Sequence, residues 1–191
     1  MSGAPAPANF DEGARCFIAL LPDAASVEIL LGCQNTIADS SAGAARRLRW
    51  VERNALHLTL RFLGPAARER QERLAGALPA LARSLGPLAT RRFGIWPNRA
   101  RPRLLVLELA PDATLEELAR GCEAEARATG FASETRPFRS HVTLARLRPG
   151  CAFGQLPAPP PAIAFHSIAL MQSNLIQPSA TYRELHRVSL G

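Results

Sequence analysis

The sequence predicts an α+β domain whose two halves resemble each other. Short apolar runs of strand length alternate with amphipathic stretches of helix length, and two strand-like segments near the C-terminus can pair as a hairpin. The pattern His-x-Thr-x occurs at 57–60 and again at 141–144. Because helices alternate with strands while a hairpin is also present, we expect antiparallel or mixed sheets flanked by helices, and not a doubly wound parallel sheet.

The first half is predicted to run strand, helix, strand. The apolar run at 16–21 has the length of a buried strand, and Pro22 and Asp23 end it. Asp23 can cap a following helix, which should end within 40–43. The apolar face of that helix is formed by Val27, Leu30, Leu31 and Ile37. A basic cluster around Trp50 precedes the first His-x-Thr-x strand and consists of Arg46, Arg47, Arg49 and Arg53.

The middle of the chain is predicted to contain a helix, a strand and a basic loop. The helix should span 67–85, with Pro79 kinking or splitting it because proline cannot donate a backbone hydrogen bond. A strand at 88–96 follows. The next segment, 97–103, is either a loop that contacts phosphate or a solvated connection, and its arginines are Arg99, Arg101 and Arg103.

The second half repeats the order of elements. A strand at 104–109 precedes a helix in which Thr114 and Glu117 have the spacing of a capping box, and Gly130 is placed to end that helix. A strand at 138–144 closes the unit. Since both units have similar lengths and end in His-x-Thr-x, we infer an internal duplication with pseudo-two-fold symmetry.

The N-terminal end of the chain is predicted to be disordered, and the C-terminal end is predicted to be folded. Residues 1–14 should form a disordered tail, followed by a single domain at 15–191. The proline-rich segment 156–161 indicates an extended connector. Strands at 163–172 and 182–189 should form the terminal hairpin.

Composition and charge narrow the class of protein. All 23 basic residues are arginine and the net charge is +7, so guanidinium groups would bind an anionic partner, although compositional bias explains the missing lysines equally well. There is no signal peptide pattern and no apolar span long enough for a membrane helix. We expect a cytoplasmic monomer with reduced, buried cysteines, which are Cys16, Cys33, Cys122 and Cys151.

The paired motifs are the candidate functional residues. On a strand, His57 and Thr59 would share one face opposite Leu58 and Leu60, and the second motif would be arranged in the same way. Two imidazoles can be held in opposite protonation states near neutral pH, as in-line opening of a phosphodiester requires. Carboxylates do not cluster near either motif, so no metal or other cofactor is predicted. The remaining histidines, His166 and His186, lack the threonine and are predicted to be structural or surface residues.

Three segments carry a resemblance to a known family. They are F-I-A-L at 17–20, N-A-L-H-L-T-L-R-F-L-G at 54–64 and R-P-F-R-S-H-V-T-L-A-R at 136–146. The chain resembles the two-histidine phosphoesterases, and most closely the RNA 2′,3′-cyclic phosphodiesterases, also called 2′-5′ RNA ligases. The resemblance implies a bilobed fold in which the two motifs face each other across a central cleft. One departure is Ser140, where the family commonly has proline before the second histidine.

The resemblance also implies an activity and roles for single residues. The expected reaction is metal-independent hydrolysis of a terminal RNA 2′,3′-cyclic phosphate to a 2′-phosphate, with reversible 2′-5′ ligation as a further activity. His57 is expected to be the proton donor and His141 the proton acceptor, while Thr59, Thr143 and Arg146 bind the substrate phosphate.

The sequence is also compatible with other functions. The same chemistry would serve 2′-5′-linked oligonucleotides or small cyclic nucleotides. A non-catalytic module that binds RNA ends is a further alternative, although two titrating groups would be superfluous in such a module.

Overall fold

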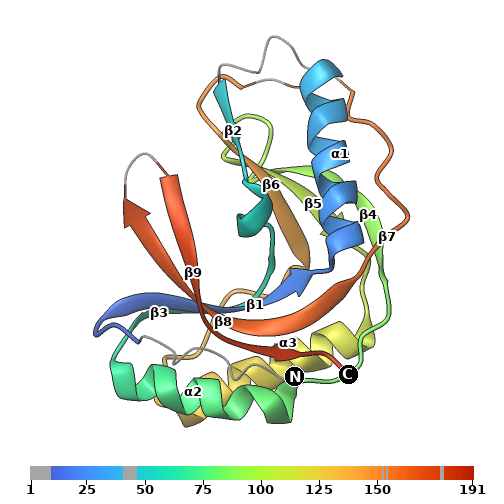
Figure 1. Ribbon diagram of the computed structural model, residues 1–191. Helices are drawn as coiled ribbons and strands as arrows, with labels where there is room; N and C mark the ends of the chain where they lie inside the picture. The colour runs from blue at the N-terminus through green and yellow to red at the C-terminus, as the bar shows by residue number, and fades with distance from the viewer. Residues whose placement is uncertain (1–9, 41–46, 152, 154, 177–178) are drawn as a thin grey trace.

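The fold consists of helices packed on an antiparallel sheet (Figure 1). The computed structural model describes residues 10–40, 47–151, 153, 155–176 and 179–191. The strands formed by the described residues are β1 (Ala14–Pro22), β2 (Leu48–Trp50), β3 (Leu58–Ala66), β4 (Leu88–Trp96), β5 (Leu104–Leu109), β6 (His141–Leu147), β7 (Ala162–Ile163), β8 (Phe165–Ile176) and β9 (Ser179–Ser189). Their helices are α1 (Ala24–Ser40), α2 (Arg68–Leu81) and α3 (Ala113–Ala128), and a 3-10 turn spans Arg53–Ala55.

The sheet has two parts that meet at a single residue pair. Its strand order is β7-β4-β5-β6-β3-β1-β8-β9, with β2 beside β6. Every pairing among the described strands is antiparallel, which confirms the α+β class and selects antiparallel over mixed sheets. The two parts are continuous because Leu58 of β3 pairs with Val142 of β6.

The two repeated units exchange their helices. Helix α1 follows β1 but lies along the part of the sheet that contains β4, β5 and β6, whereas α3 follows β5 but lies with α2 against the part that contains β3 (Figure 1). The predicted repeat of strand, helix and strand is therefore present as β1-α1-β3 and β5-α3-β6. Each part of the sheet is covered by a helix of the other unit, and the single domain at 15–191 stays a prediction.

The helix ends test the predicted caps. The side chain of Asp23 accepts a hydrogen bond of 2.7 Å from the backbone N–H of Ser26, as expected for a cap of α1. The capping box predicted at Thr114 is wrong, because Asp112 immediately precedes the helix and its side chain accepts from the N–H of Leu115 at 2.8 Å. Gly130 has a φ of 87° just beyond α3, which confirms the predicted C-terminal cap.

The remaining boundaries differ modestly from the predictions. Helix α2 continues through Pro79 but ends at Leu81, four residues before the predicted end. The terminal hairpin is longer than predicted, and part of its predicted turn, 177–178, lies outside the described residues. Of the predicted tail, 1–9 lie outside the described residues, whereas Phe10 already packs against the core.

Three of the cysteines are buried as predicted, while Cys33 is half-buried against the core. All four are unpaired. None of the helices in the described ranges is both long and apolar enough to cross a membrane. The cytoplasmic location and the monomeric state stay predictions.

Two buried polar side chains connect the exchanged helices to the sheet. Gln34 of α1 donates to the carbonyl oxygens of Val51 at 2.9 Å and Leu144 at 3.0 Å. In the other part, the Arg61 guanidinium bonds to Glu123 of α3 and to the carbonyl oxygens of Phe62 and Ala132. Burial of either group would be unfavourable without these partners, so both contacts hold a helix at one definite position on the sheet.

We expect Gln34→Ala to lower the free energy of unfolding by about 1–3 kcal/mol, because it leaves the half-buried Val51 carbonyl without its amide donor. Urea denaturation measures the change. Thr36→Ala is the matched control on the same helix, since the Thr36 hydroxyl bonds to the Gly32 carbonyl at an exposed position. Equal stability of the two variants would contradict this role of Gln34.

Candidate active site

The junction between the two parts of the sheet gathers the paired motifs. Leu58 and Val142, the middle residues of the two His-x-Thr sequences, are partners in an antiparallel pair and are both fully buried. Because side chains alternate along a strand, the histidines and threonines on either side of this pair point to the opposite face. His57, Thr59, His141 and Thr143 are half-buried there. We call this the histidine face.

A β-bulge follows the threonine of each motif. On β3 the register with β1 passes from Thr59 to Arg61, and on β6 the register with β5 passes from Thr143 to Ala145. One extra residue, Leu60 or Leu144, is thereby accommodated in each strand. The consequence of an extra residue is that the alternation of faces shifts by one.

The bulges return the fifth residue after each histidine to the histidine face. That residue is Arg146 in the second motif, and in a regular strand it would point with Val142 into the core. Instead it is exposed, and its Nη2 donates to the Tyr182 hydroxyl at 3.0 Å. The equivalent residue of the first motif is Phe62, which is 52% exposed. The duplication thus places a cation on one side of the histidine pair and an aromatic ring on the other.

His57 is enclosed by aromatic rings. Its Nδ1 lies 2.7 Å from the carbonyl oxygen of Ala55. The ring centroids of Phe17 and Tyr182 lie 4.9 Å and 5.1 Å from that of His57, and Tyr182 meets it edge-on. These contacts fix the plane of the imidazole.

His141 has an equivalent backbone contact but different neighbours. Its Nδ1 lies 2.7 Å from the carbonyl oxygen of Arg139, and the Trp96 ring centroid is 4.3 Å from its own. The preceding Ser140 is held to β5, because its carbonyl accepts from the Leu109 N–H at 3.1 Å. The segment before His141 is therefore anchored by hydrogen bonds although it lacks the family's proline.

The backbone contacts determine which ring nitrogen can react. A carbonyl oxygen only accepts hydrogen bonds, so the neutral imidazole must carry its proton on Nδ1 in both residues. This leaves the Nε2 lone pair of His57 and of His141 available to accept a proton. The same two nitrogens can donate once the rings are protonated.

The surroundings also shift both pKa values. Burial lowers the pKa of His57 to about 4, the contact with the Ala55 carbonyl opposes this change, and the charges of His141 and Arg146 add to it. Burial likewise lowers the pKa of His141, with the Arg139 carbonyl and the Glu108 carboxylate opposing the change. In the protein without substrate, burial and the nearby positive charges therefore favour the neutral form of His57.

The other predicted residues lie in several places. Arg46 lies outside the described residues, and Arg47 donates to the Pro149 carbonyl at 3.0 Å. In the basic loop, Arg99 donates to the Phe153 carbonyl at 3.3 Å. Phosphate contact by this loop stays a prediction. His166 is exposed on β8 and its Nδ1 is 3.1 Å from the Pro22 carbonyl, which agrees with a structural role.

Sequence analysis missed three aromatic residues at the histidines. Phe17, Trp96 and Tyr182 come from β1, β4 and β9, and no local motif links them to a histidine. The sequence offers one signal for two of them, which is that tyrosine and tryptophan are rare in this chain, with one tyrosine and two tryptophans. Trp96 is also the last residue of its strand, immediately before the basic loop.

The fold and the site together define an antiparallel α+β protein with two His-x-Thr motifs paired on one face of its sheet. Residues 34–106 match the family model described as LigT like Phosphoesterase. This segment contains the first motif, and the second lies beyond it. The fold is also similar to the crystal structure of E. coli LigT in complex with 3′-AMP. The two structures superpose over 94% of this chain and 99% of the LigT chain, with a TM-score of 0.73 and 25% sequence identity.

Two proteins from other organisms are similar to this chain in sequence. An RNA 2′,3′-cyclic phosphodiesterase of Bacillus subtilis (strain 168) is 33% identical over 100 residues, which are 51% of this chain and 55% of that protein. One from Geobacillus stearothermophilus is 31% identical over 134 residues, which are 66% of this chain and 43% of that protein. The chain thus spans about half the length of these two relatives. These findings confirm the resemblance to the LigT-like phosphoesterases.

We expect the His57 ring to titrate with a midpoint near 4, below the ordinary 6.5 of histidine. Between these values the unfolded chain binds a proton that the folded protein does not, so stability should fall as the pH drops from about 6.5 to about 4. Nitrogen-15 NMR of the imidazoles measures the midpoint. Arg146→Met should raise it by removing a nearby cation, whereas Arg148→Met serves as the control on the same segment. A wild-type midpoint near 6.5 would contradict this expectation.

Proposed function

We propose that the protein is an RNA 2′,3′-cyclic phosphodiesterase that hydrolyses the terminal cyclic phosphate to a 2′-phosphate without a metal or other cofactor. The observation that carries the proposal is the pairing of the two motifs through Leu58 and Val142, which sets both histidines on one face. Each histidine has its Nδ1 occupied by a backbone carbonyl, so each directs Nε2 to the chemistry. The names of the relatives support this choice of substrate.

The reaction needs a base and an acid on opposite sides of phosphorus. Water attacks phosphorus while the base takes one of its protons, and the bond from phosphorus to the 3′ oxygen breaks as the acid protonates that oxygen. The products are a 2′-phosphate and a free 3′ hydroxyl. Two histidines from neighbouring strands suit these roles, because in-line displacement places the attacking and leaving oxygens far apart.

The threonines and Arg146 would bind the non-bridging oxygens. Thr59 and Thr143 share the histidine face and can donate their hydroxyl protons to the phosphate. Arg146 comes to the same face through the bulge at Leu144 and is held by Tyr182. Its guanidinium would offset the negative charge that spreads over these oxygens in the transition state.

We assign His141 as the base and His57 as the acid, following the resemblance to the family. The free protein favours the reverse distribution, because burial lowers the pKa of His57 to about 4, and the charges of His141 and Arg146 add to that change. A bound phosphate brings negative charge against Arg146 and both rings. The assignment therefore concerns the substrate complex, in which that negative charge favours the protonated form of His57 against the effects of burial and of Arg146.

We expect His57→Ala and His141→Ala each to abolish most turnover of an oligonucleotide that ends in a 2′,3′-cyclic phosphate. The double variant should be little slower than either single variant, because the two residues act as one acid-base unit. Turnover should persist in excess chelator and follow a bell-shaped pH profile. The assay measures release of the 2′-phosphate product by chromatography.

His166→Ala is the control for this experiment, since that histidine is exposed and makes its contact outside the paired motifs. Multiplicative losses in the double variant would contradict the acid-base pair. A requirement for an added divalent metal would contradict the metal-independent mechanism. Binding without turnover would favour a non-catalytic module instead.

The two roles can be separated with a substrate whose 3′ leaving atom is sulfur. A thiolate leaves without protonation, so this substrate should restore much of the lost rate to His57→Ala and none to His141→Ala. Rate constants measured on both substrates with both variants give the comparison. Recovery of His141→Ala alone would exchange the roles, and a 3′-phosphate product from the ordinary substrate would reverse the choice of bond.

A further inference from the structure

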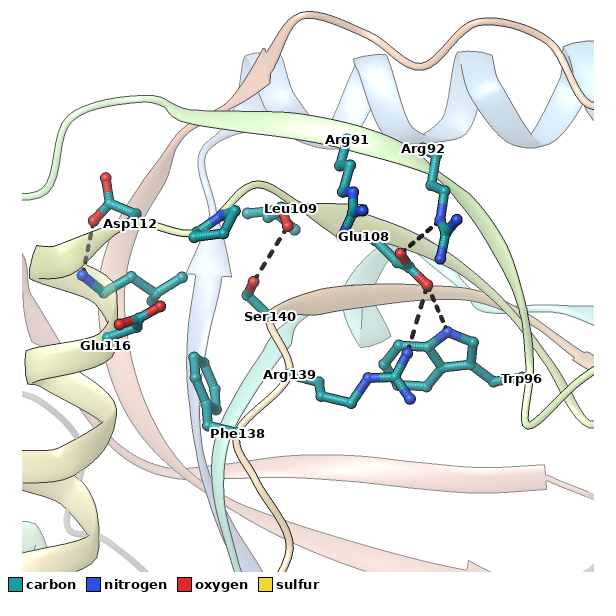
Figure 2. Close-up of a pocket in the computed structure, with 12 residues that line it drawn as sticks. Arg91, Arg92, Trp96, Glu108, Leu109, Asp112, Glu116, Phe138, Arg139 and Ser140 are labelled. Carbon is teal, nitrogen blue, oxygen red and sulfur yellow. Dashed lines mark hydrogen bonds and ion pairs between the residues drawn. The ribbon is translucent and has the colours of Figure 1, made fainter.

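A buried carboxylate lies beside the second motif. Glu108 of β5 is the register partner of His141, and its side chain is only 9% exposed. Its Oε2 accepts from Arg92 Nε at 2.9 Å and its Oε1 accepts from the indole N–H of Trp96 at 2.8 Å, while Arg139 Nη2 lies 3.7 Å from Oε1 (Figure 2). Burial raises the pKa of Glu108, but the Trp96 and Arg92 contacts outweigh this and lower it. The carboxylate is thus an ionised anchor.

Trp96 connects this anchor to the catalytic histidine. Its indole N–H is bonded to Glu108, and its ring lies against the His141 imidazole at a centroid distance of 4.3 Å, with the two ring planes tilted by 47°. The Arg139 guanidinium lies over the same indole, 3.7 Å from its centroid. The backbone carbonyl of Arg139 in turn receives the Nδ1 contact of His141. Both the ring and the Nδ1 of His141 are therefore held by groups that Glu108 positions.

Gly94 of β4 makes room for this arrangement. A Cβ at that position would lie 2.7 Å from Glu108 Oε1 and 3.2 Å from Trp96 Nε1, the two atoms of the hydrogen bond. Any other residue would push the carboxylate or the indole away. The backbone of Gly94 does not have the positive φ that favours glycine. Glycine is needed here because a side chain would collide with Glu108 and Trp96.

The other histidine has no equivalent support among the described residues. Its ring contacts Phe17 and Tyr182, and no carboxylate is bonded to either of them. The two halves of the duplicated site thus differ in the groups that hold their rings.

We propose that Trp96, anchored by Glu108, is a positioning residue that holds the His141 imidazole with Nε2 toward the substrate. The inference rests on the proposed function only for its effect on turnover. The charged groups that face His141 are Glu108 and Arg139 beside it and His57 across the strand pair. Because Trp96 is neutral, its removal should misplace the ring more than it changes the local charge.

The kinetic test compares variants of Trp96 with a variant of Gly94, the glycine that leaves room for the hydrogen bond from Trp96 to Glu108. Trp96→Leu and Gly94→Ala should each lower kcat on the order of 10-fold to 100-fold with little change in KM, because misplacement of a catalytic group by about 1 Å costs that much. Trp96→Phe retains a ring and should recover part of the loss. Glu117→Gln is the matched control, since Glu117 forms an exposed ion pair with Arg83. Thermal unfolding establishes that each variant is folded.

A spectroscopic test needs no turnover and therefore stands apart from the proposed function. In a Trp50→Phe background, Trp96 is the only tryptophan, and protonation of the adjacent imidazole should quench its fluorescence. We expect a fluorescence titration that disappears in His141→Gln and remains in His57→Gln. A titration unaffected by His141→Gln, or normal kcat in Trp96→Leu, would overturn the proposal. An inactive wild type with the expected titration would overturn only the proposed function.

Discussion

The pairing of Leu58 with Val142 is the contact on which the site depends. It joins the two parts of the sheet, and it places the two motifs at the same point with their polar residues on one face. A shift of either strand by one residue would move that strand's histidine and threonine into the core. Complete burial of both apolar residues makes such a shift costly, so hydrophobic packing on one face keeps the histidines and threonines together on the other.

Exchange of helices between the units protects this junction. Gln34 ties α1 to the bulge carbonyl of Leu144 in one part, and Arg61 ties β3 to α3 in the other. Each connection crosses from one repeated unit to the other. The parts of the sheet cannot separate without exposing apolar surface and leaving buried polar groups unpaired, which are both unfavourable.

The duplication creates two similar histidines, and their neighbours then make them different. Phe62 and Arg146 occupy equivalent positions after the two bulges, so aromatic and cationic groups lie on opposite sides of the pair. Aromatic rings hold His57, whereas an indole anchored to a carboxylate lies against His141. Acid-base chemistry requires such a difference, because two identical imidazoles would compete for one proton.

Sequence patterns alone predicted the order of the elements, the duplication, the apolar backs of both motifs and the candidate histidines and threonines. These features depend on local periodicity, which a single chain displays directly. The three-dimensional structure was needed to show that Arg146 reaches the histidine face, because the bulge at Leu144 reverses the direction of its side chain. It was likewise needed to show that Asp112 and not Thr114 caps α3, and that Trp96 lies against His141. Those outcomes depend on the register between strands that are distant in sequence and on which of two nearby residues caps a helix. The spacing of residues along the chain does not determine either of them.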